Sequence, residues 1–204
     1  MAEFGLVVIG AHIGIHIKEE LEEYKNMKAL LIEPVEHNVK SIKKNLKDFK
    51  NLIIEEIALA SRSEIRDFFF IKENSIHKLK KHWASGIGSF NKKHILSHRN
   101  KRFKVEEEDI QKKKIQCLTF KDLIEKYEIT SIEKLNIDIE GSEYEILNEI
   151  DYDKIYIKKI MFEYKHFDGY LKTGAKLEEI LSKLKGKNYT TTKIDEENIL
   201  AVKV

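Results

Sequence analysis

The stretch VVIGAHIGIHI, which spans residues 7–17, decides the fold. An apolar run stops at Gly10, turns through three residues and resumes at Gly14. Glycine costs backbone entropy and packs no side chain, so a buried strand does not ordinarily end in two glycines. The pattern indicates a tight turn, or a place where another group approaches the backbone closely. We predict a buried strand over residues 4–9 and a helix over residues 14–24.

The rest of the chain alternates between strand and helix patterns. Apolar runs predict further strands at residues 28–33, 52–57, 65–71, 115–118, 132–138 and 155–164, with a turn at 61–63 joining the second and third of these. Helical spacing and two capping boxes, at 119–122 and 142–145, predict helices at residues 36–46, 119–127, 142–150 and 177–184, and a terminal hairpin is expected at 189–194 and 199–204. Alternating strands and helices indicate an α/β fold whose parallel sheet is covered on both faces.

Length and composition bound the class of protein. The 204 residues, 42% of them hydrophobic, suit one domain over residues 1–204. No continuous apolar stretch reaches the roughly 18–20 residues of a membrane span, and no signal peptide is recognisable. The single cysteine, Cys117, excludes an internal disulfide, fits a reducing cytoplasmic compartment and is expected to be buried.

The charge is balanced overall but unevenly distributed. The formal net charge is +2, yet residues 74–105 contain no acidic residue and hold nine lysines or arginines and four histidines. We expect a lid-like insertion whose cations hold an anionic acceptor, or alternatively a solvated loop. Trp83 and Phe90 lie among these charges, which leaves nucleic-acid contact open. The small net charge argues against a nucleic-acid enzyme, and the oligomeric state is not predicted.

The glycine turn and the second strand together indicate a ligand. In an open parallel sheet, ligands bind beyond the carboxyl ends of the strands. Gly10 and Gly14 lie at that edge, and Glu33 ends the second strand about twenty residues later, where a carboxylate accepts hydrogen bonds from ribose hydroxyls. This spacing predicts a cofactor that contains adenosine. His12 stands where a dinucleotide site prefers glycine, which disfavours NAD and leaves room for a ligand without phosphates, such as S-adenosylmethionine.

Several motifs in one order resemble the FkbM-type S-adenosylmethionine-dependent methyltransferases. They are IGAHIG (residues 9–14), IEPVEHNVKSIKKNL (32–46), ALAS (58–61), GIGSF (86–90), LTFKDLIEKYEITSIEKLNIDIEGSEYEIL (118–147) and IMFEY (160–164). The most distinctive is the Asp-x-Glu-Gly-x-Glu pattern in the long fifth block. The resemblance implies a Rossmann-like, doubly wound, mostly parallel seven-stranded sheet with an antiparallel terminal strand and a small hairpin or lid insertion.

The resemblance also implies transfer of a methyl group from S-adenosylmethionine to a hydroxyl oxygen. The acceptor would be a small molecule, a sugar or a lipid-linked compound. The residues expected to bind the cofactor are Gly10, Ala11, His12 and Gly14 for the methionine part, Glu33 for the ribose, and Glu56, Ile57 and Ala58 for the adenine edge.

Two carboxylates are the catalytic candidates. Asp138 follows the predicted strand 132–138 and Glu140 lies in the next turn, so either faces the sulfonium or accepts the substrate proton, Asp138 first. The alternative is that both merely support the N-terminus of the following helix. Ser89, Glu163 and His166 are expected near the acceptor. Asp138, Glu140 and Glu163 could meet in space, but no set has metal-ligand spacing, so no metal is assigned.

Two other functions remain open at this stage. One is a nicotinamide-dependent oxidoreductase, against which His12 argues. The other is a module that binds the cofactor or an anionic polymer without turnover. It draws support from Val8, which stands where relatives commonly have an acidic residue, and from a start almost at the first strand, without the N-terminal helices of many relatives.

Overall fold

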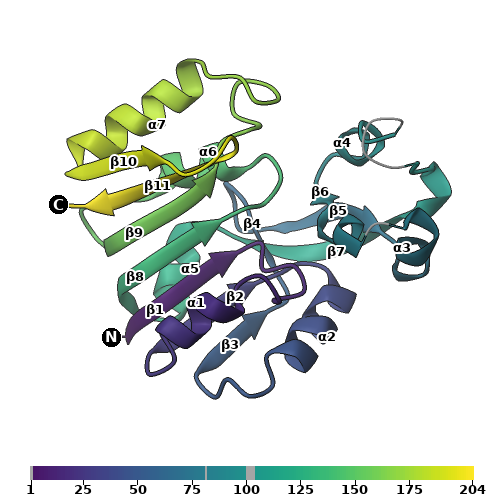
Figure 1. The fold of residues 1–204 in the computed structure, drawn as a ribbon, viewed down its shortest axis with the longest axis horizontal. Coiled ribbons are helices and arrows are strands. Elements are labelled where there is room, and N and C mark those ends of the chain that lie inside the picture. Colours follow the sequence, from purple (N-terminus) through teal and green to yellow (C-terminus); the bar gives the residue numbers. More distant parts are fainter. Residues whose placement is uncertain (1, 81, 100–103) are drawn as a thin grey trace.

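A seven-stranded sheet forms the centre of the molecule (Figure 1). The computed structural model describes residues 2–80, 82–99 and 104–204. The strands are β1 (Ala2–Ile9), β2 (Lys28–Ile32), β3 (Leu52–Glu55), β8 (Ile129–Ile137), β9 (Tyr156–Glu163), β10 (Tyr189–Lys193) and β11 (Asn198–Lys203). Their order is β10-β11-β9-β8-β1-β2-β3, and β11 runs antiparallel to both of its neighbours. The predicted mostly parallel sheet with an antiparallel terminal strand is confirmed.

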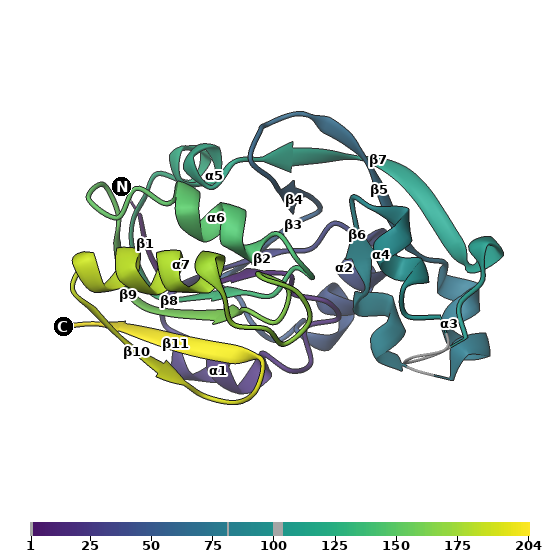
Figure 2. The same cartoon turned by 90° about the horizontal axis from the view of Figure 1, so that it is seen from above.

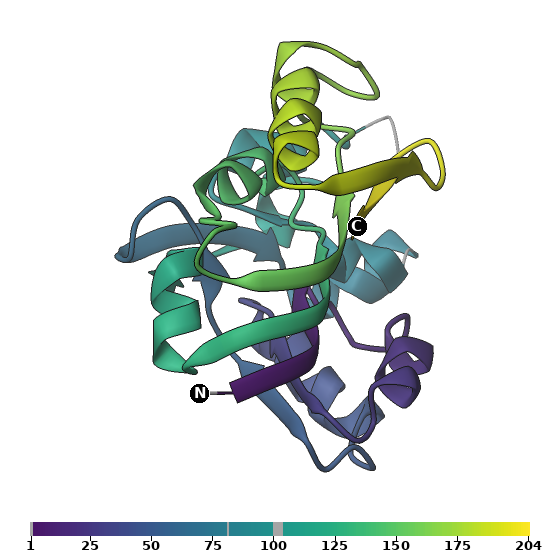
Figure 3. The same cartoon turned by 90° about the vertical axis from the view of Figure 1, so that its left-hand side faces the viewer.

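Five helices cover the two faces of this sheet (Figure 3). They are α1 (Lys18–Glu23) and α2 (Glu36–Asn45) on one face, and α5 (Phe120–Lys126), α6 (Glu143–Glu149) and α7 (Ala175–Gly186) on the other. Side chains of β1 alternate between the faces, because successive residues of a strand point in opposite directions. Leu6 and Val8 pack in the α1–α2 core, whereas Val7 and Ile9 belong to the core beneath α5, α6 and α7. The doubly wound arrangement therefore follows from a strand that is apolar on both sides.

A second, four-stranded sheet corrects two predictions. It orders β4 (Ala58–Leu59), β7 (Ile110–Leu118), β5 (Ile65–Ile71) and β6 (Gly88–Ser89) as β4-β7-β5-β6. The strand predicted at 52–57 ends at Glu55, and the connection to β5 includes the short strand β4 before the bend at residues 61–62; β3 pairs with β2, whereas β5 pairs with β7 and β6. The predicted strand 115–118 was too short, because β7 begins with polar residues that pair along all of β5.

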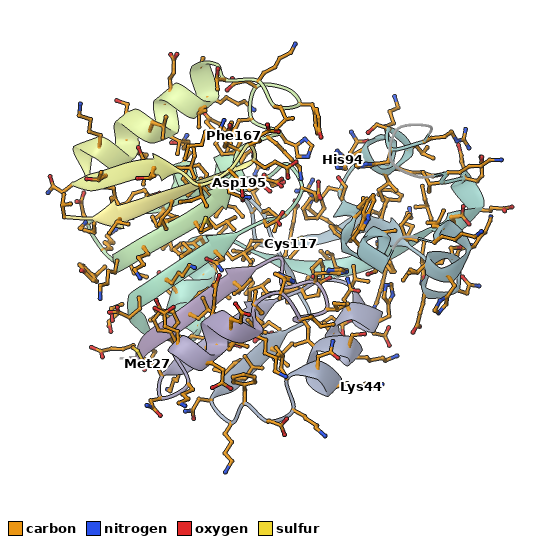
Figure 4. The ribbon with its side chains drawn as sticks, viewed as in Figure 1. Met27, Lys44, His94, Cys117, Phe167 and Asp195 are labelled. Carbon is orange, nitrogen blue, oxygen red and sulfur yellow. The ribbon has the colours of Figure 1, made fainter. Side chains whose placement is uncertain are left out.

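The distal ends of β5 and β7 carry an insertion lobe, defined here as residues 72–109 (Figures 1 and 2). It contains α3 (Glu73–Leu79), the 3-10 turns η1 (His82–Gly86) and η2 (Glu107–Asp109), and α4 (Lys92–Leu96). Its described part has an apolar core that includes Leu79, Ala84, Ile87, Ile95 and Val105. The expected basic insertion is thus a packed lobe rather than a solvated loop. Cys117 is buried on β7, as predicted (Figure 4).

No helix within the described ranges is both long enough and apolar enough to cross a membrane.

Replacing Gly10 tests the turn that ends β1. Gly10 has a φ of +92°, and an added Cβ would lie 1.8 Å from the Asp138 carbonyl oxygen. Gly10→Ala should therefore lower the free energy of unfolding by at least about 2 kcal/mol in urea denaturation. The control is Gly186→Ala at the end of α7, where an added Cβ meets no atom within 4 Å and the change should stay below about 1 kcal/mol. Equal stability of the two variants would contradict the close contact.

Candidate active site

A cavity of about 720 Å³ lies between the main sheet and the insertion lobe. Its main-sheet wall comes from the carboxyl ends of β1, β2 and β8 and the segment after β9, and includes Gly10, His12, Glu33, Asp138, Glu140 and His166. Its opposite wall comes from the second sheet and the lobe, and includes Ala58, Arg66, Phe68, Trp83, Ser89 and His94. The chain reverses its direction of winding between β1 and β8, which is where open α/β sheets bind their ligands.

The two glycines that open the sequence motif serve backbone packing. The Gly10 N–H donates to the Ile32 carbonyl at 3.0 Å, so the turn is fastened to β2 while it also lies against Asp138. Gly14 has a φ of +78°, and a Cβ there would meet Leu46 Cδ1 at 2.9 Å. Gly10 borders the cavity, whereas Ala11 and Gly14 are not among the residues that line it. The group that closely approaches the backbone at Gly10 is therefore another part of the protein, the Asp138 carbonyl.

The Glu33 carboxylate joins the glycine turn to β2 and α2. It is buried, and it accepts hydrogen bonds from the N–H groups of His12 at 2.9 Å and Val35 at 3.1 Å and from the Asn38 side chain at 3.1 Å. Burial raises its pKa to about 7, although the three donors oppose the shift. Its Oε2 atom accepts only the His12 bond among these, which leaves a lone pair for a ligand in the cavity.

Polar contacts also attach the lobe to this corner. The Asn38 side chain donates to the Ser85 carbonyl at 2.8 Å, and His12 Nε2 lies 2.5 Å from Ser85 Oγ. A Cβ added to Gly86 would lie 3.4 Å from the His12 ring. The position of the lobe is thus tied to the same residues that shape the glycine turn.

The turn between β8 and α6 is built around Glu143. Its buried carboxylate accepts hydrogen bonds from Ile139 N–H at 2.7 Å and Gly141 N–H at 3.0 Å. Burial raises its pKa to about 7. The capping box predicted at 142–145 is wrong, because the Ser142 side chain makes no capping bond and the Glu143 carboxylate accepts only from N–H groups of the preceding turn in these bonds. The other predicted box is confirmed in part, since Thr119 Oγ1 accepts from Asp122 N–H at 3.0 Å.

Asp138 and Glu140 both reach the cavity from this turn, in different electrostatic states. Burial of the Asp138 carboxyl group and the nearby charge of Glu140 raise the pKa of Asp138 to about 6. Burial would also raise the pKa of Glu140, but His166, His94 and Lys165 outweigh it and hold the pKa below its ordinary value. Glu140 Oε2 lies 3.2 Å from His166 Nε2 and 3.8 Å from Lys165 Nζ. Glu140 is therefore a fixed anion, whereas Asp138 can exchange a proton near neutral pH.

Glu163 lies behind this wall instead of on it. The buried carboxylate forms an ion pair with the equally buried Lys165, which also lies 3.4 Å from Glu197. Burial, and then the charge of Asp138, raise the pKa of Glu163 above its ordinary value, and the ion pair with Lys165 opposes the shift. Of the three residues expected near the acceptor, Ser89 and His166 line the cavity and Glu163 does not.

The apolar corner of the cavity involves residues slightly further along the chain than the sequence predicts. Ala58 lines it together with Val35 and Leu59, whereas Glu56 and Ile57 are not lining residues. The Glu56 carboxylate forms an ion pair with Lys113 at 2.9 Å. Sequence reasoning missed the lining residues Arg66, Phe68 and His94. Nothing in the sequence marks them, because long-range pairing of the second sheet brings Arg66 and Phe68 to the site and packing of the lobe brings His94 there.

Ion pairs offset much of the positive charge in the lobe. Acidic residues 106–109 pair with Lys78, Lys92 and Arg99. Lys81, Lys101 and Arg102 of the predicted basic segment lie outside the described residues. Among the described residues that line the cavity, the basic groups are Arg66 and four histidines, with no lysine.

Comparison with known proteins identifies the family. A family model described as "Methyltransferase FkbM domain" matches residues 9–191. The chain belongs to the FkbM methyltransferase family. It is therefore an S-adenosylmethionine-dependent methyltransferase, as the resemblance implied, and the nicotinamide alternative is set aside. No curated protein matches the chain.

Several solved structures align with nearly the whole chain at low identity. Precorrin-6y C5,15-methyltransferase from Geobacter metallireducens is 14% identical with a TM-score of 0.48, and the alignment covers 100% of this chain and 82% of that one. TrmK of M. capricolum, bound to S-adenosylhomocysteine, is 12% identical with a TM-score of 0.43, covering 98% and 61%. Aeropyrum pernix fibrillarin, bound to S-adenosylmethionine, is 8% identical with a TM-score of 0.46, covering 98% and 66%. The family assignment therefore rests on the family model.

The residues that line the cavity are chemically suited to S-adenosylmethionine, the cofactor of the FkbM family. Glu33 offers a carboxylate with a free lone pair to a ribose hydroxyl, and Val35, Ala58 and Leu59 offer an apolar surface to a flat base. Asp138 and Glu140 give the cavity wall after β8 an acidic character that suits a sulfonium cation.

Glu33 should make the stability of the protein depend on pH. The pKa of Glu33 is about 7 in the folded protein against an ordinary 4.5. Between these two pH values, folding is therefore accompanied by uptake of a proton. The free energy of unfolding consequently falls as the pH rises through this window. Between pH 5 and pH 8, the free energy of unfolding of the wild type should fall by about 1–3 kcal/mol relative to Glu33→Gln. Urea denaturation across this range measures the difference.

The matched control for this experiment is Glu125→Gln, on the exposed surface of α5. Its stability should run parallel to that of the wild type at every pH. A constant difference between Glu33→Gln and the wild type would contradict the raised pKa.

Proposed function

We propose that this FkbM methyltransferase methylates a hydroxyl oxygen on a small molecule, a sugar or a lipid-linked acceptor. The observation that carries the proposal is Asp138, a carboxylate that lines the cavity with a pKa of about 6. A hydroxyl becomes a good nucleophile only when its proton has an acceptor, and a base with a pKa near the working pH serves best. Asp138 meets this requirement at the carboxyl end of β8.

Each part of the cofactor has candidate contacts. Glu33 accepts a hydrogen bond from the ribose, Gly10 and His12 contact the methionine part, and Ala58 and Val35 pack on the adenine. Ala11 and Gly14 act indirectly, by giving the turn its shape. Glu56 and Ile57 are left out of this assignment because neither lines the cavity.

The protein contributes alignment and proton transfer. When bound, the cofactor would supply a methyl group on a sulfonium for an in-line displacement in which S-adenosylhomocysteine is the leaving group. Fixing the acceptor oxygen opposite the sulfur removes much of the entropic cost of this step. Asp138 takes the hydroxyl proton as the oxygen–methyl bond forms, and the neighbouring anion Glu140 keeps that proton acceptor basic. Ser89 and His166 border the remaining space and hold the acceptor.

Cofactor binding is tested first. S-adenosylhomocysteine should raise the melting temperature of the wild type, and NAD should not. Glu33→Ala should weaken the binding of S-adenosylhomocysteine at least about tenfold, because the ribose loses a charge-assisted hydrogen bond. Calorimetric titration gives the affinity, and Glu125→Ala serves as the exposed control with unchanged affinity.

An unchanged affinity in Glu33→Ala would remove that residue from the cofactor site. Stabilisation by NAD alone would overturn the cofactor assignment.

Asp138→Asn tests the base. Methyl transfer to a panel of hydroxyl acceptors, followed with radiolabelled S-adenosylmethionine, should fall at least about a hundredfold while the affinity for S-adenosylhomocysteine is kept. In the wild type, kcat/KM should rise with pH through about 6 as Asp138 loses its proton, and the variant should lack this rise. Asp153→Asn, a remote exposed carboxylate paired with Lys187, is the control.

Rates that are unchanged in Asp138→Asn would exclude this residue as the base. Tight cofactor binding by the wild type without transfer to any acceptor in the panel would instead favour the non-catalytic binding module.

A further inference from the structure

Three residues from distant parts of the chain converge on one side of the cavity. His94 lies on α4 of the insertion lobe, Glu140 lies in the β8–α6 turn, and His166 follows β9. Each offers one ligand atom, and these atoms all lie within 4.8 Å of one another. All three residues line the cavity, and His94 is on the side of the lobe that faces the main sheet (Figure 4).

The geometry of this group suits a metal ion. The Nε2 atoms of both histidines approach the same oxygen, Glu140 Oε2, at 3.2 Å from His166 and 3.9 Å from His94. Two ligand atoms bound to one tetrahedral ion at roughly 2.1 Å lie about 3.4 Å apart. Small side-chain movements therefore bring the three atoms to bonding distance of one ion.

A hydrogen-bonded cluster alone leaves one atom unexplained. His94 Nε2 is buried and has no hydrogen-bond partner among the described residues, because 3.9 Å is too long for a hydrogen bond to Glu140. Buried polar atoms in proteins are nearly always satisfied. A bound ion would satisfy His94 and Glu140 together.

The charge around the group also favours a cation. Lys165 lies 3.8 Å from Glu140, but Glu163 and Glu197 already pair with it. Glu140, Glu163 and Glu197 therefore share one lysine. A divalent cation would relieve the repulsion among these carboxylates.

A second carboxylate group is a weaker candidate. Asp138, Glu143 and Glu163 also lie within 4.8 Å of one another. However, Glu143 already accepts bonds from backbone N–H groups, and Glu163 pairs with Lys165. Two of its three carboxylates thus already have partners in the fold, although Glu163 Oε2 has none among the described residues.

We propose that His94, Glu140 and His166 bind one divalent transition-metal ion. Two imidazoles and a carboxylate are typical ligands of Zn²⁺, Mn²⁺ and Fe²⁺, whereas Mg²⁺ prefers an all-oxygen site. Three protein ligands leave a coordination position open toward the cavity. This step rests on the proposed function: the hydroxyl oxygen of the acceptor binds the ion at the open position. The bound ion would lower the pKa of that hydroxyl, and Asp138 would then remove its proton. The ion would also link the lobe to the main sheet.

The test measures binding without cofactor or acceptor. Chelator-treated wild-type protein is titrated calorimetrically with Zn²⁺, Mn²⁺ and Mg²⁺, and Co²⁺ binding is followed by its visible absorption. We expect one equivalent of Zn²⁺ or Mn²⁺ to bind, and Mg²⁺ to bind much more weakly. His94→Ala and His166→Ala should each weaken the transition-metal affinity at least about tenfold and alter the Co²⁺ spectrum.

His77→Ala is the matched control, because His77 is an exposed histidine on α3 that does not line the cavity. Its metal affinity should equal that of the wild type. Circular dichroism and melting of all variants without metal verify that each is folded.

The proposal is overturned if the wild type shows no saturable binding of one equivalent, or if His94→Ala and His166→Ala bind as tightly as the wild type. This result is independent of the proposed function. Methyl transfer and the effect of Asp138→Asn are measured separately, so either idea can fail while the other stands.

Discussion

The buried Glu33 carboxylate is the contact on which the rest of the site depends. It holds the His12 N–H of the glycine turn and the Asn38 side chain of α2, and Asn38 in turn holds the Ser85 carbonyl of the insertion lobe. One carboxylate thus sets the distance between the end of β1, the start of α2 and the lobe. A buried carboxylate is costly unless its hydrogen bonds are satisfied, and here three donors reduce that cost.

The sequence predicts the parts of the molecule in which neighbours in the chain are also neighbours in space. The strand before Gly10 is apolar on both sides and is followed by a helix, so its place inside a parallel sheet follows from local pattern. Glu33 is predictable for the same reason, because parallel strands that leave one edge place their carboxyl ends together. The position of Asp138 after β8 follows from this rule as well.

The second sheet, the lobe and the cap of α6 depend on contacts that leave no periodic signal. The polar first half of β7 pairs with β5, although about forty residues separate the two strands in the chain. Neither strand has a sequence pattern that predicts which strand it pairs with. His94 reaches the cavity only because the lobe packs as a unit on its own apolar core. At α6, the Ser142 side chain makes no capping bond, and the turn through Glu140 and Gly141, both with positive φ, instead brings the N–H groups of Ile139 and Gly141 to the Glu143 carboxylate.

The electrostatics of the cavity give a second reason for the choice of cofactor, beyond the side chain of His12. Glu33, Asp138 and Glu140 all line the cavity. The pyrophosphate of a dinucleotide would bring two negative charges into this space and meet carboxylates that are already crowded enough for the pKa of Asp138 to be raised. S-adenosylmethionine carries a sulfonium instead, and a positive charge beside Asp138 and Glu140 lowers their mutual repulsion. Transfer of the methyl group removes that positive charge, so the same carboxylates that favour binding of the cofactor favour its product less.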